Sequence, residues 1–271
     1  MNVFDFLSDD DISGPCVVLD ELLPLVHTTP SRCTMDILQK MRLEKKTCNK
    51  FNGERLLYFF YARPAYRKVE EDTSSDRSLV PVVLIVKPIL DDIKRVYPFD
   101  SGAFDDYKKN HLNHSTKRSD YELPNTFLAI RQYIKAIFGN NLHYYIGKCR
   151  VGSELPDSIV QHRETNHDLD NLLNLISSMN RDKLDDRRKT IEIQSSNDYD
   201  LSGKLLSIIV PNFYRNDKEF LKIIKASGAE PDYYTYYHGF RINEYVYGVY
   251  DCVKKYYVKQ GHIALEDNYE N

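Results

Sequence analysis

The most constraining feature of this sequence is a short apolar run, PVVLIVKP, at residues 81–88. The run is continuous, rich in β-branched side chains and bounded by prolines, which together are typical of a buried strand. The longest apolar run of the chain, from Val80 to Val86, falls far short of the roughly 20 residues that a membrane-spanning helix needs. We therefore expect a soluble chain with a sheet at its core and no membrane partner.

Composition and charge exclude several classes of protein. The chain has 271 residues, of which 42% are hydrophobic and 28% are charged, and this balance excludes collagen-like, low-complexity and wholly disordered proteins. Its 37 basic and 40 acidic residues give a formal net charge of −3, which implies no general attraction to nucleic acid or to membranes. The five cysteines are scattered, and the acidic start MNVFDFLSDDD does not resemble a signal peptide, so a cytoplasmic location is expected.

The apolar periodicity predicts short strands interspersed with helices, without a regular β-α-β alternation. Strands are expected at residues 17–26, 55–63, 81–88, 189–194, 205–211 and 233–240. Helices are expected at residues 31–43 (with Ser31 as N-cap), 124–138, 167–179, 217–226 and, at the C-terminal end, 243–258. The polar segment 105–122 is expected to be an exposed loop inserted in a single domain over residues 1–271. This arrangement predicts a mixed α+β fold.

Most fingerprints of common active sites are missing from the sequence. It contains no G-x-G-x-x-G, so a Rossmann dinucleotide site is not indicated, and neither G-x-S-x-G nor H-E-x-x-H occurs. The segment 147–153 has the glycine spacing of a phosphate loop but places Ser153 where such a loop needs a lysine. No metal site is expected.

Three segments place polar residues in or at the end of expected strands. His27-Thr28-Thr29 closes the first strand. Arg63 ends the aromatic strand, where a guanidinium is suited to clamp a pyrophosphate or a carboxylate, although a surface salt bridge is the simpler interpretation. Glu192 lies on an alternating strand, and this alternation is compatible with either a solvent-facing or a functional carboxylate.

The order of these segments resembles the ADP-ribosyltransferase superfamily and, within it, the DarT-type toxins that ADP-ribosylate DNA. The matching positions are His27 and Thr29 of a His-x-Thr opening, Arg63 after the aromatic run Tyr58-Phe59-Phe60, and Glu192 after Arg187-Arg188. Segment 97–121 has no counterpart in the family's pattern. The resemblance implies an ADP-ribosyltransferase-like α+β fold, with a split mixed β-sheet and flanking helices.

The resemblance also implies an NAD-dependent mono-ADP-ribosyltransferase, with NAD as its substrate. Such an enzyme modifies a nucleic acid or a protein, acts as a toxin or antiphage effector, and has a neutralising antitoxin as partner. The implied catalytic residues are Glu192, which stabilises the sugar cation that forms when the glycosidic bond of NAD breaks, and Arg63, which binds the pyrophosphate. The implied NAD-binding residues are His27, Thr29, Tyr58, Tyr66 and Arg67.

Two other functions fit the same residues. One is a non-catalytic nucleotide or nucleic-acid binding module of the same fold, and the other is a structural or interaction protein. The chain has 21 tyrosines and no tryptophan, and seven of these tyrosines gather between residues 233 and 250. They suit base stacking, but ring packing with a solvated hydroxyl is the simpler interpretation. The turn 98–102 is expected to be structural, although its aspartate and serine are also suited to contact a ligand.

Overall fold

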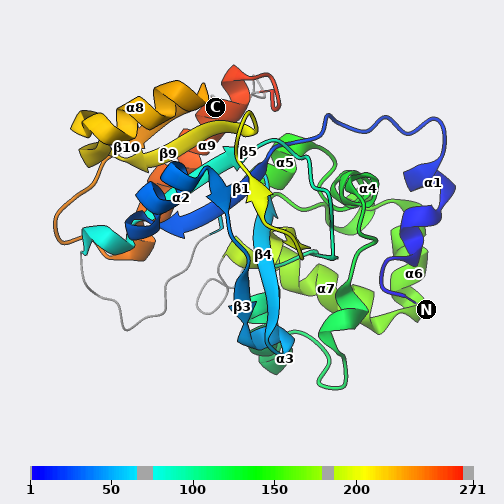
Figure 1. Cartoon of the computed structure of the whole chain (residues 1–271). Helices are drawn as coiled ribbons and strands as arrows, with labels where there is room; N and C mark the ends of the chain where they lie inside the picture. The colour runs from blue at the N-terminus through cyan, green and yellow to red at the C-terminus, as the bar shows by residue number, and fades with distance from the viewer. Residues whose placement is uncertain (1, 66–75, 179–185, 265–271) are drawn as a thin grey trace. The chain divides into compact units, whose positions relative to one another are not determined.

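The computed structural model of the chain describes residues 2–65, 76–178 and 186–264. It is a mixed α+β structure with a central mixed sheet flanked by helices (Figure 1). The chain divides into two compact units, each assembled from separated segments. The helical unit contains residues 1–22, 93–193 and 262–271, and the sheet unit contains residues 23–92 and 194–261. The expectation of a single domain over residues 1–271 stays a prediction.

The sheet unit is centred on β5, whose six residues are all buried. Its strands are β1 (Leu25–Pro30), β2 (Arg42–Leu43), β3 (Lys46–Cys48), β4 (Glu54–Tyr61), β5 (Pro81–Val86), β8 (Tyr199–Asp200), β9 (Leu205–Pro211) and β10 (Glu230–Tyr234). In the order β10-β9-β5-β1-β4, only the β9–β10 pair is parallel. Strand β3 pairs with β4, and β2 pairs with β8. The buried strand expected from the proline-bounded run is confirmed.

Among the described residues, the α-helices of the sheet unit are α2 (Thr34–Lys40), α8 (Lys218–Ser227) and α9 (Val246–Lys259). Helix α9 packs against β5, β9 and β10, and α8 packs against α2 (Figure 1). The Asp217 side chain accepts hydrogen bonds from the first turn of α8, and Gly228 ends this helix in the left-handed conformation, with φ of 74°. The expected helices at 217–226 and 243–258 are therefore confirmed to within a few residues.

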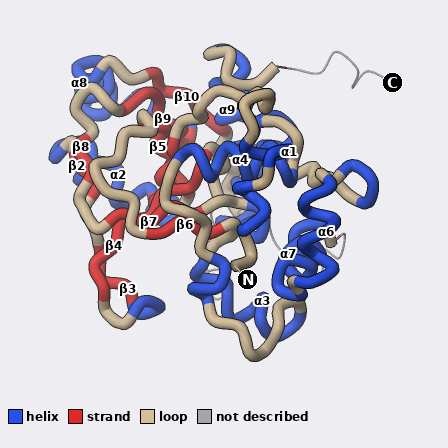
Figure 2. The backbone as a smooth tube through the Cα atoms, turned by 90° about the vertical axis from the view of Figure 1, so that its right-hand side faces the viewer, coloured by secondary structure: helices blue, strands red, loops and turns tan. Residues whose placement is uncertain are grey.

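The helical unit consists mainly of short helices (Figure 2). Its elements are α1 (Asp10–Ser13), β6 (Arg95–Tyr97), α3 (Phe104–Asn110), α4 (Phe127–Ile137), α5 (Asn141–Ile146), α6 (Asp157–Thr165) and α7 (His167–Ser177). The apolar faces of α4 and α7 are buried, and the side chains of Thr126 and Asn166 cap their first turns, which confirms both helix predictions. In the described part of the chain, no helix is long and apolar enough to cross a bilayer.

Strand β7 (Glu192–Ser195) crosses the division between the two units. Its first two residues belong to the helical unit and its last two to the sheet unit. All four residues are buried, and Glu192 and Gln194 are covered as completely as the isoleucine between them. Of the two interpretations of Glu192, the solvent-facing one is therefore wrong. The strand begins at Glu192, so residues 189–191 of the expected strand lie outside it.

The expectation of an exposed loop over 105–122 is also wrong. Helix α3 occupies the first part of this segment, and Tyr107, Leu112 and Tyr121 are buried. The rings of Tyr107 and Tyr121 pack on Phe99, with centroids 5.5 and 5.6 Å from it. The prediction failed because it rested on the polar composition of the segment, whereas its few aromatic side chains bury enough apolar surface to pack it against the protein.

Three other boundaries differ from the prediction. Strand β1 begins at Leu25 and includes the His-Thr-Thr segment, whereas residues 17–24 form no strand. The helix expected at 31–43 is a short 3-10 turn followed by α2, and the Ser31 hydroxyl contacts the Tyr214 hydroxyl at 3.0 Å instead of capping the helix. Strand β10 ends at Tyr234, so residues 235–240 lie outside it.

Candidate functional site

His27 lies on β1 and is tied to the neighbouring strand. Its Nδ1 lies 2.9 Å from the backbone oxygen of Tyr58 on β4. Burial lowers the pKa of His27, the Tyr58 carbonyl opposes this effect, and the charge of Lys46 adds to it. The side chain is therefore a neutral imidazole at neutral pH, with its proton on Nδ1 because the carbonyl can only accept. This tautomer leaves Nε2 as a hydrogen-bond acceptor.

The two threonines after His27 are positioned differently. Thr29, which the resemblance assigns to NAD binding, is 4% exposed. The Oγ1 atom of Thr28 is buried and has no hydrogen-bond partner among the described residues. A buried hydroxyl in this state is satisfied by a water or a ligand oxygen, so Thr28 joins the candidates. The sequence pattern pointed to the segment but not to this residue, because an orphan hydroxyl is visible only in three dimensions.

Arg63 follows β4 and turns into the sheet unit rather than out to solvent. The side chain is 1% exposed, and its Cζ lies 5.6 Å from the ring centroid of Tyr250 on α9. The preceding residue, Ala62, has φ of 58°, and its carbonyl accepts a hydrogen bond of 2.9 Å from Tyr257. The surface position considered for Arg63 is therefore wrong, because the guanidinium is buried within the sheet unit, after a left-handed residue that α9 holds.

The other residues assigned to NAD binding are only partly described. Tyr58 is half-buried on β4, next to the strand that carries His27. Tyr66 and Arg67 lie outside the described residues.

Glu192 opens β7 and is buried, with 1% exposure. Its two carboxylate oxygens accept hydrogen bonds from Ser101, at 2.6 Å from Oγ and 3.2 Å from the backbone nitrogen. The carboxylate also lies close enough to Tyr97 that its charge adds to burial and to the Glu122 hydrogen bond in raising the pKa of Tyr97. A solvent-facing Glu192 is therefore excluded, and the carboxylate is held in a defined orientation by two donors from one residue.

The turn that carries Ser101 is fastened to the segment before Glu192. Asp100 accepts a hydrogen bond from the Gly102 backbone, and its carboxylate lies 3.1 Å from the Arg187 guanidinium. The Asp100 backbone nitrogen donates to the Arg187 carbonyl at 3.0 Å. The turn 98–102 thus contributes directly to the environment of Glu192, and this role was missed because the two segments are about ninety residues apart.

The predicted site residues thus fall into two groups. His27, Thr29, Tyr58 and Arg63 belong to the sheet unit, where the hydrogen bond between His27 and β4 joins two of the predicted segments. Glu192 belongs to the helical unit together with Ser101. The convergence of Arg63 and Glu192 on one substrate stays a prediction.

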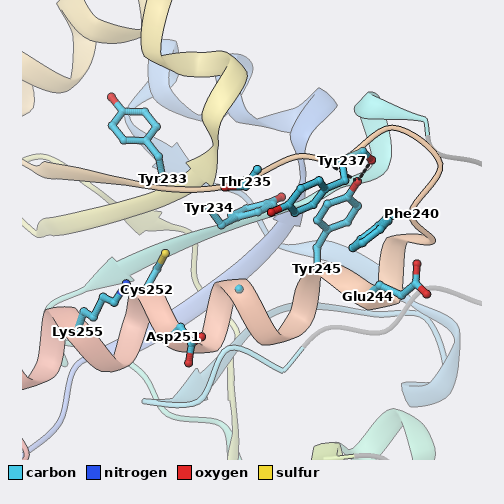
Figure 3. Close-up of a pocket in the computed structure, with 11 residues that line it drawn as sticks. Tyr233, Tyr234, Thr235, Tyr237, Phe240, Glu244, Tyr245, Asp251, Cys252 and Lys255 are labelled. Carbon is cyan, nitrogen blue, oxygen red and sulfur yellow. Dashed lines mark hydrogen bonds between the residues drawn. The ribbon is translucent and has the colours of Figure 1, made fainter.

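A separate pocket lies in the sheet unit, between α9 and residues 233–240, with a volume of about 280 Å³ (Figure 3). Its lining includes five aromatic residues of the tyrosine-rich segment, namely Tyr233, Tyr234, Tyr237, Phe240 and Tyr245. The remainder of the lining is Thr235, Glu244, Gly248, Asp251, Cys252 and Lys255.

Within residues 2–65, 76–178 and 186–264, no group of three or more histidine, cysteine, aspartate or glutamate side chains is placed to hold a metal ion. Comparison of the chain with protein-family models, with curated proteins and with solved structures finds no match.

Proposed function

We propose that this protein is an NAD-dependent mono-ADP-ribosyltransferase that modifies a nucleic acid or a protein and acts as a toxin or antiphage effector. In this reaction the bond between the ribose C1′ and the nicotinamide nitrogen breaks, and its electron pair leaves with neutral nicotinamide. A nucleophile of the acceptor then forms a new bond to C1′ and loses a proton. The transition state has the character of a sugar cation, which a carboxylate stabilises.

The observation that carries the proposal is the buried carboxylate of Glu192. Burying a carboxylate in a strand costs free energy unless hydrogen bonds compensate, so such a group is more often found where chemistry requires it. Ser101 supplies two donors to this carboxylate, one to each oxygen, which fix its orientation. An oriented carboxylate in surroundings of low dielectric constant interacts more strongly with a developing positive charge than one in water does.

The sheet unit supports the proposal because it contains groups that are suited to bind the pyrophosphate and a ribose of NAD. Arg63 provides a buried guanidinium, whose paired donors match the oxygens of a pyrophosphate. His27 offers Nε2 as an acceptor for a ribose hydroxyl. A neutralising antitoxin is the expected partner of such a protein.

The first test measures nicotinamide release and transfer of label from radioactive NAD, with single-stranded nucleic acid and a protein mixture as acceptors. We expect wild-type protein to release nicotinamide and Glu192→Gln to lose about 100-fold or more of this rate, as when one stabilising group is removed from a transition state. The matched control is Glu164→Gln, which changes an exposed glutamate of the same unit. Equal rates for wild-type and Glu192→Gln protein contradict the proposal.

A non-catalytic nucleotide or nucleic-acid binding module is the second candidate. The arrangement of Ser101 favours it, because both oxygens of Glu192 already accept hydrogen bonds and the side chain is buried. This candidate predicts that NAD or an oligonucleotide raises the melting temperature of the wild-type protein without any nicotinamide release. The same stabilisation is then expected to be lost in Arg63→Ala and retained in Glu192→Gln.

A further inference from the structure

The pocket between α9 and residues 233–240 has preformed aromatic walls. The Tyr245 hydroxyl donates to the Tyr237 carbonyl at 2.5 Å and accepts from the Tyr237 backbone nitrogen at 3.2 Å. The Tyr234 hydroxyl donates to the Pro81 carbonyl at 2.7 Å. These bonds hold two of the rings in place, and a ligand that enters therefore meets ring faces and edges more than free hydroxyls.

Part of the aromatic surface at the pocket is left uncovered. Tyr237 is 52% exposed and Phe240 is 43% exposed, and their ring centroids lie 4.9 Å apart. On its other side Tyr245 stacks with Tyr236, at 5.6 Å between centroids and 13° between planes, and the Arg77 guanidinium lies 5.2 Å from the Tyr236 ring centroid. A ring that stacks on Tyr245 thus already contacts a cation of this chain, the Arg77 guanidinium, through its face.

The charged side chains along the pocket are unevenly placed. Glu244 lies at the end that carries Tyr245 and Phe240, whereas Lys255 lies at the opposite end with Cys252 (Figure 3). Ten helical residues lie between Glu244 and Lys255, and the eleven helical steps from one to the other span roughly 16 Å along the axis. Asp251 is the third charged residue of the lining. Among the charged residues of the lining, the one at the aromatic end is therefore a carboxylate.

Two titratable groups in the lining are affected by burial and by neighbouring carboxylates. Burial raises the pKa of Tyr245, and the Glu244 carboxylate adds to the rise while the Tyr237 backbone opposes it. Burial raises the pKa of Cys252 to about 12, with Asp232 and Asp251 adding to the rise and Lys255 opposing it. In both groups, neighbouring carboxylates favour the protonated form.

Gly248 forms part of the pocket lining on α9. A Cβ atom built at this position meets only the Tyr234 Cβ, at the ordinary contact distance of 3.5 Å. Alanine and leucine are better helix formers than glycine, so either can replace Gly248 without weakening the helix. The missing side chain therefore leaves space that a ligand can occupy.

We propose that this pocket binds a quaternary alkylammonium group, held against its aromatic rings and beside the Glu244 carboxylate. An alkylated cation suits the site because it offers no N–H donor, and the hydroxyls of Tyr234 and Tyr245 are already engaged. Aromatic rings next to a carboxylate favour such a cation over an uncharged group of the same shape. The inference goes beyond the proposed transferase reaction and does not depend on it.

The test titrates the full chain with choline chloride and, separately, with 3,3-dimethylbutan-1-ol, which has the same shape without the charge. Binding is followed by NMR through the tyrosine ring signals. We expect choline to bind about tenfold more tightly than the alcohol. A peptide with trimethyl-lysine, compared with the unmodified peptide, shows whether the group is recognised free or on a protein. Equal binding of choline and the alcohol, or no saturable binding of any of these cations at millimolar concentration, overturns the proposal.

Variants show whether choline binds in this pocket or elsewhere on the surface of the protein. We expect Gly248→Leu to weaken choline binding about tenfold, and Gly248→Ala to weaken it less, while neither lowers the melting temperature. Glu244→Gln keeps an oxygen that accepts from the Arg241 backbone nitrogen but removes the negative charge. We therefore expect this variant to bind choline several-fold more weakly. The matched controls are Glu219→Gln and Tyr247→Ala, which change exposed side chains outside the lining and are expected to leave binding unchanged. Unchanged binding in Gly248→Leu places choline elsewhere and overturns the proposal.

Discussion

Strands β5 and β7 are both buried along their whole lengths, but the side chains that they bury differ in kind. β5 consists of apolar residues, whereas β7 carries a glutamate, a glutamine and a serine around one isoleucine. A buried apolar side chain stabilises the fold by about 1.5–3 kcal/mol through the hydrophobic effect, whereas a buried carboxylate costs free energy until donors compensate. β5 therefore holds the fold together, and β7 places a polar group whose stability depends on its partners.

The largest effect is expected on β5. Leu84 is fully buried, so Leu84→Ala is expected to lower the free energy of unfolding by about 2–5 kcal/mol, because it removes apolar contacts and leaves a cavity. The change is measured by urea denaturation, with the same dependence of unfolding free energy on urea concentration (the m-value) applied to wild type and variants. Ile89→Ala, at a position that is 50% exposed, is the control and is expected to change it by less than about 0.5 kcal/mol. A loss no larger than that of the control contradicts the structural role given to β5.

A smaller effect is expected when β7 loses its partner. Ser101→Ala removes the hydroxyl that donates to Glu192 over 2.6 Å, and a hydrogen bond to a charged group contributes about 1.5–3 kcal/mol. The backbone donor of residue 101 remains, so the lower part of this range is expected in the same denaturation experiment. Ser119→Ala, at an exposed serine of the same unit, is the control. Equal stability of the two variants indicates that the Glu192 carboxylate does not depend on Ser101.

The smallest effect concerns His27, which pairs with Leu84 across β1 and β5. Burial lowers the pKa of His27 in the folded state below its ordinary value of 6.5. The unfolded chain therefore binds more protons at acidic pH, and the stability due to the neutral ring is lost as the pH falls through about 6.5. His27→Asn keeps a donor for the Tyr58 carbonyl and cannot titrate.

The measurement for His27 is the free energy of unfolding as a function of pH. The wild-type curve is expected to fall more steeply than the His27→Asn curve below about pH 6.5, since only the wild type carries this linked proton. His114→Asn, at an exposed histidine, serves as control. Parallel curves for wild-type and His27→Asn protein show that β1 contributes no proton-linked stability.

Several elements follow from local pattern alone. The proline-bounded β5, the apolar β9 and the amphipathic helices α4, α7 and α8 lie close to their expected positions, because their apolar spacing matches the period of the element that they form. The aromatic density of β4 likewise predicted a strand. Among the candidate site residues, the pattern located a polar segment on β1 and an arginine at the end of β4, but not the burial of either.

Most strands and helices, and the polar residues that interrupt them, could be predicted from the chain, because short-range periodicity and turn chemistry are local properties. Three features could not be predicted in this way: the burial of Arg63, the packing of rings on α3, and the hydrogen bonds from a distant serine to Glu192. These features depend on contacts between residues far apart in the chain, in units that are each assembled from separated segments. The free energy of burying a charge is determined by such contacts and not by the residues beside it in the sequence.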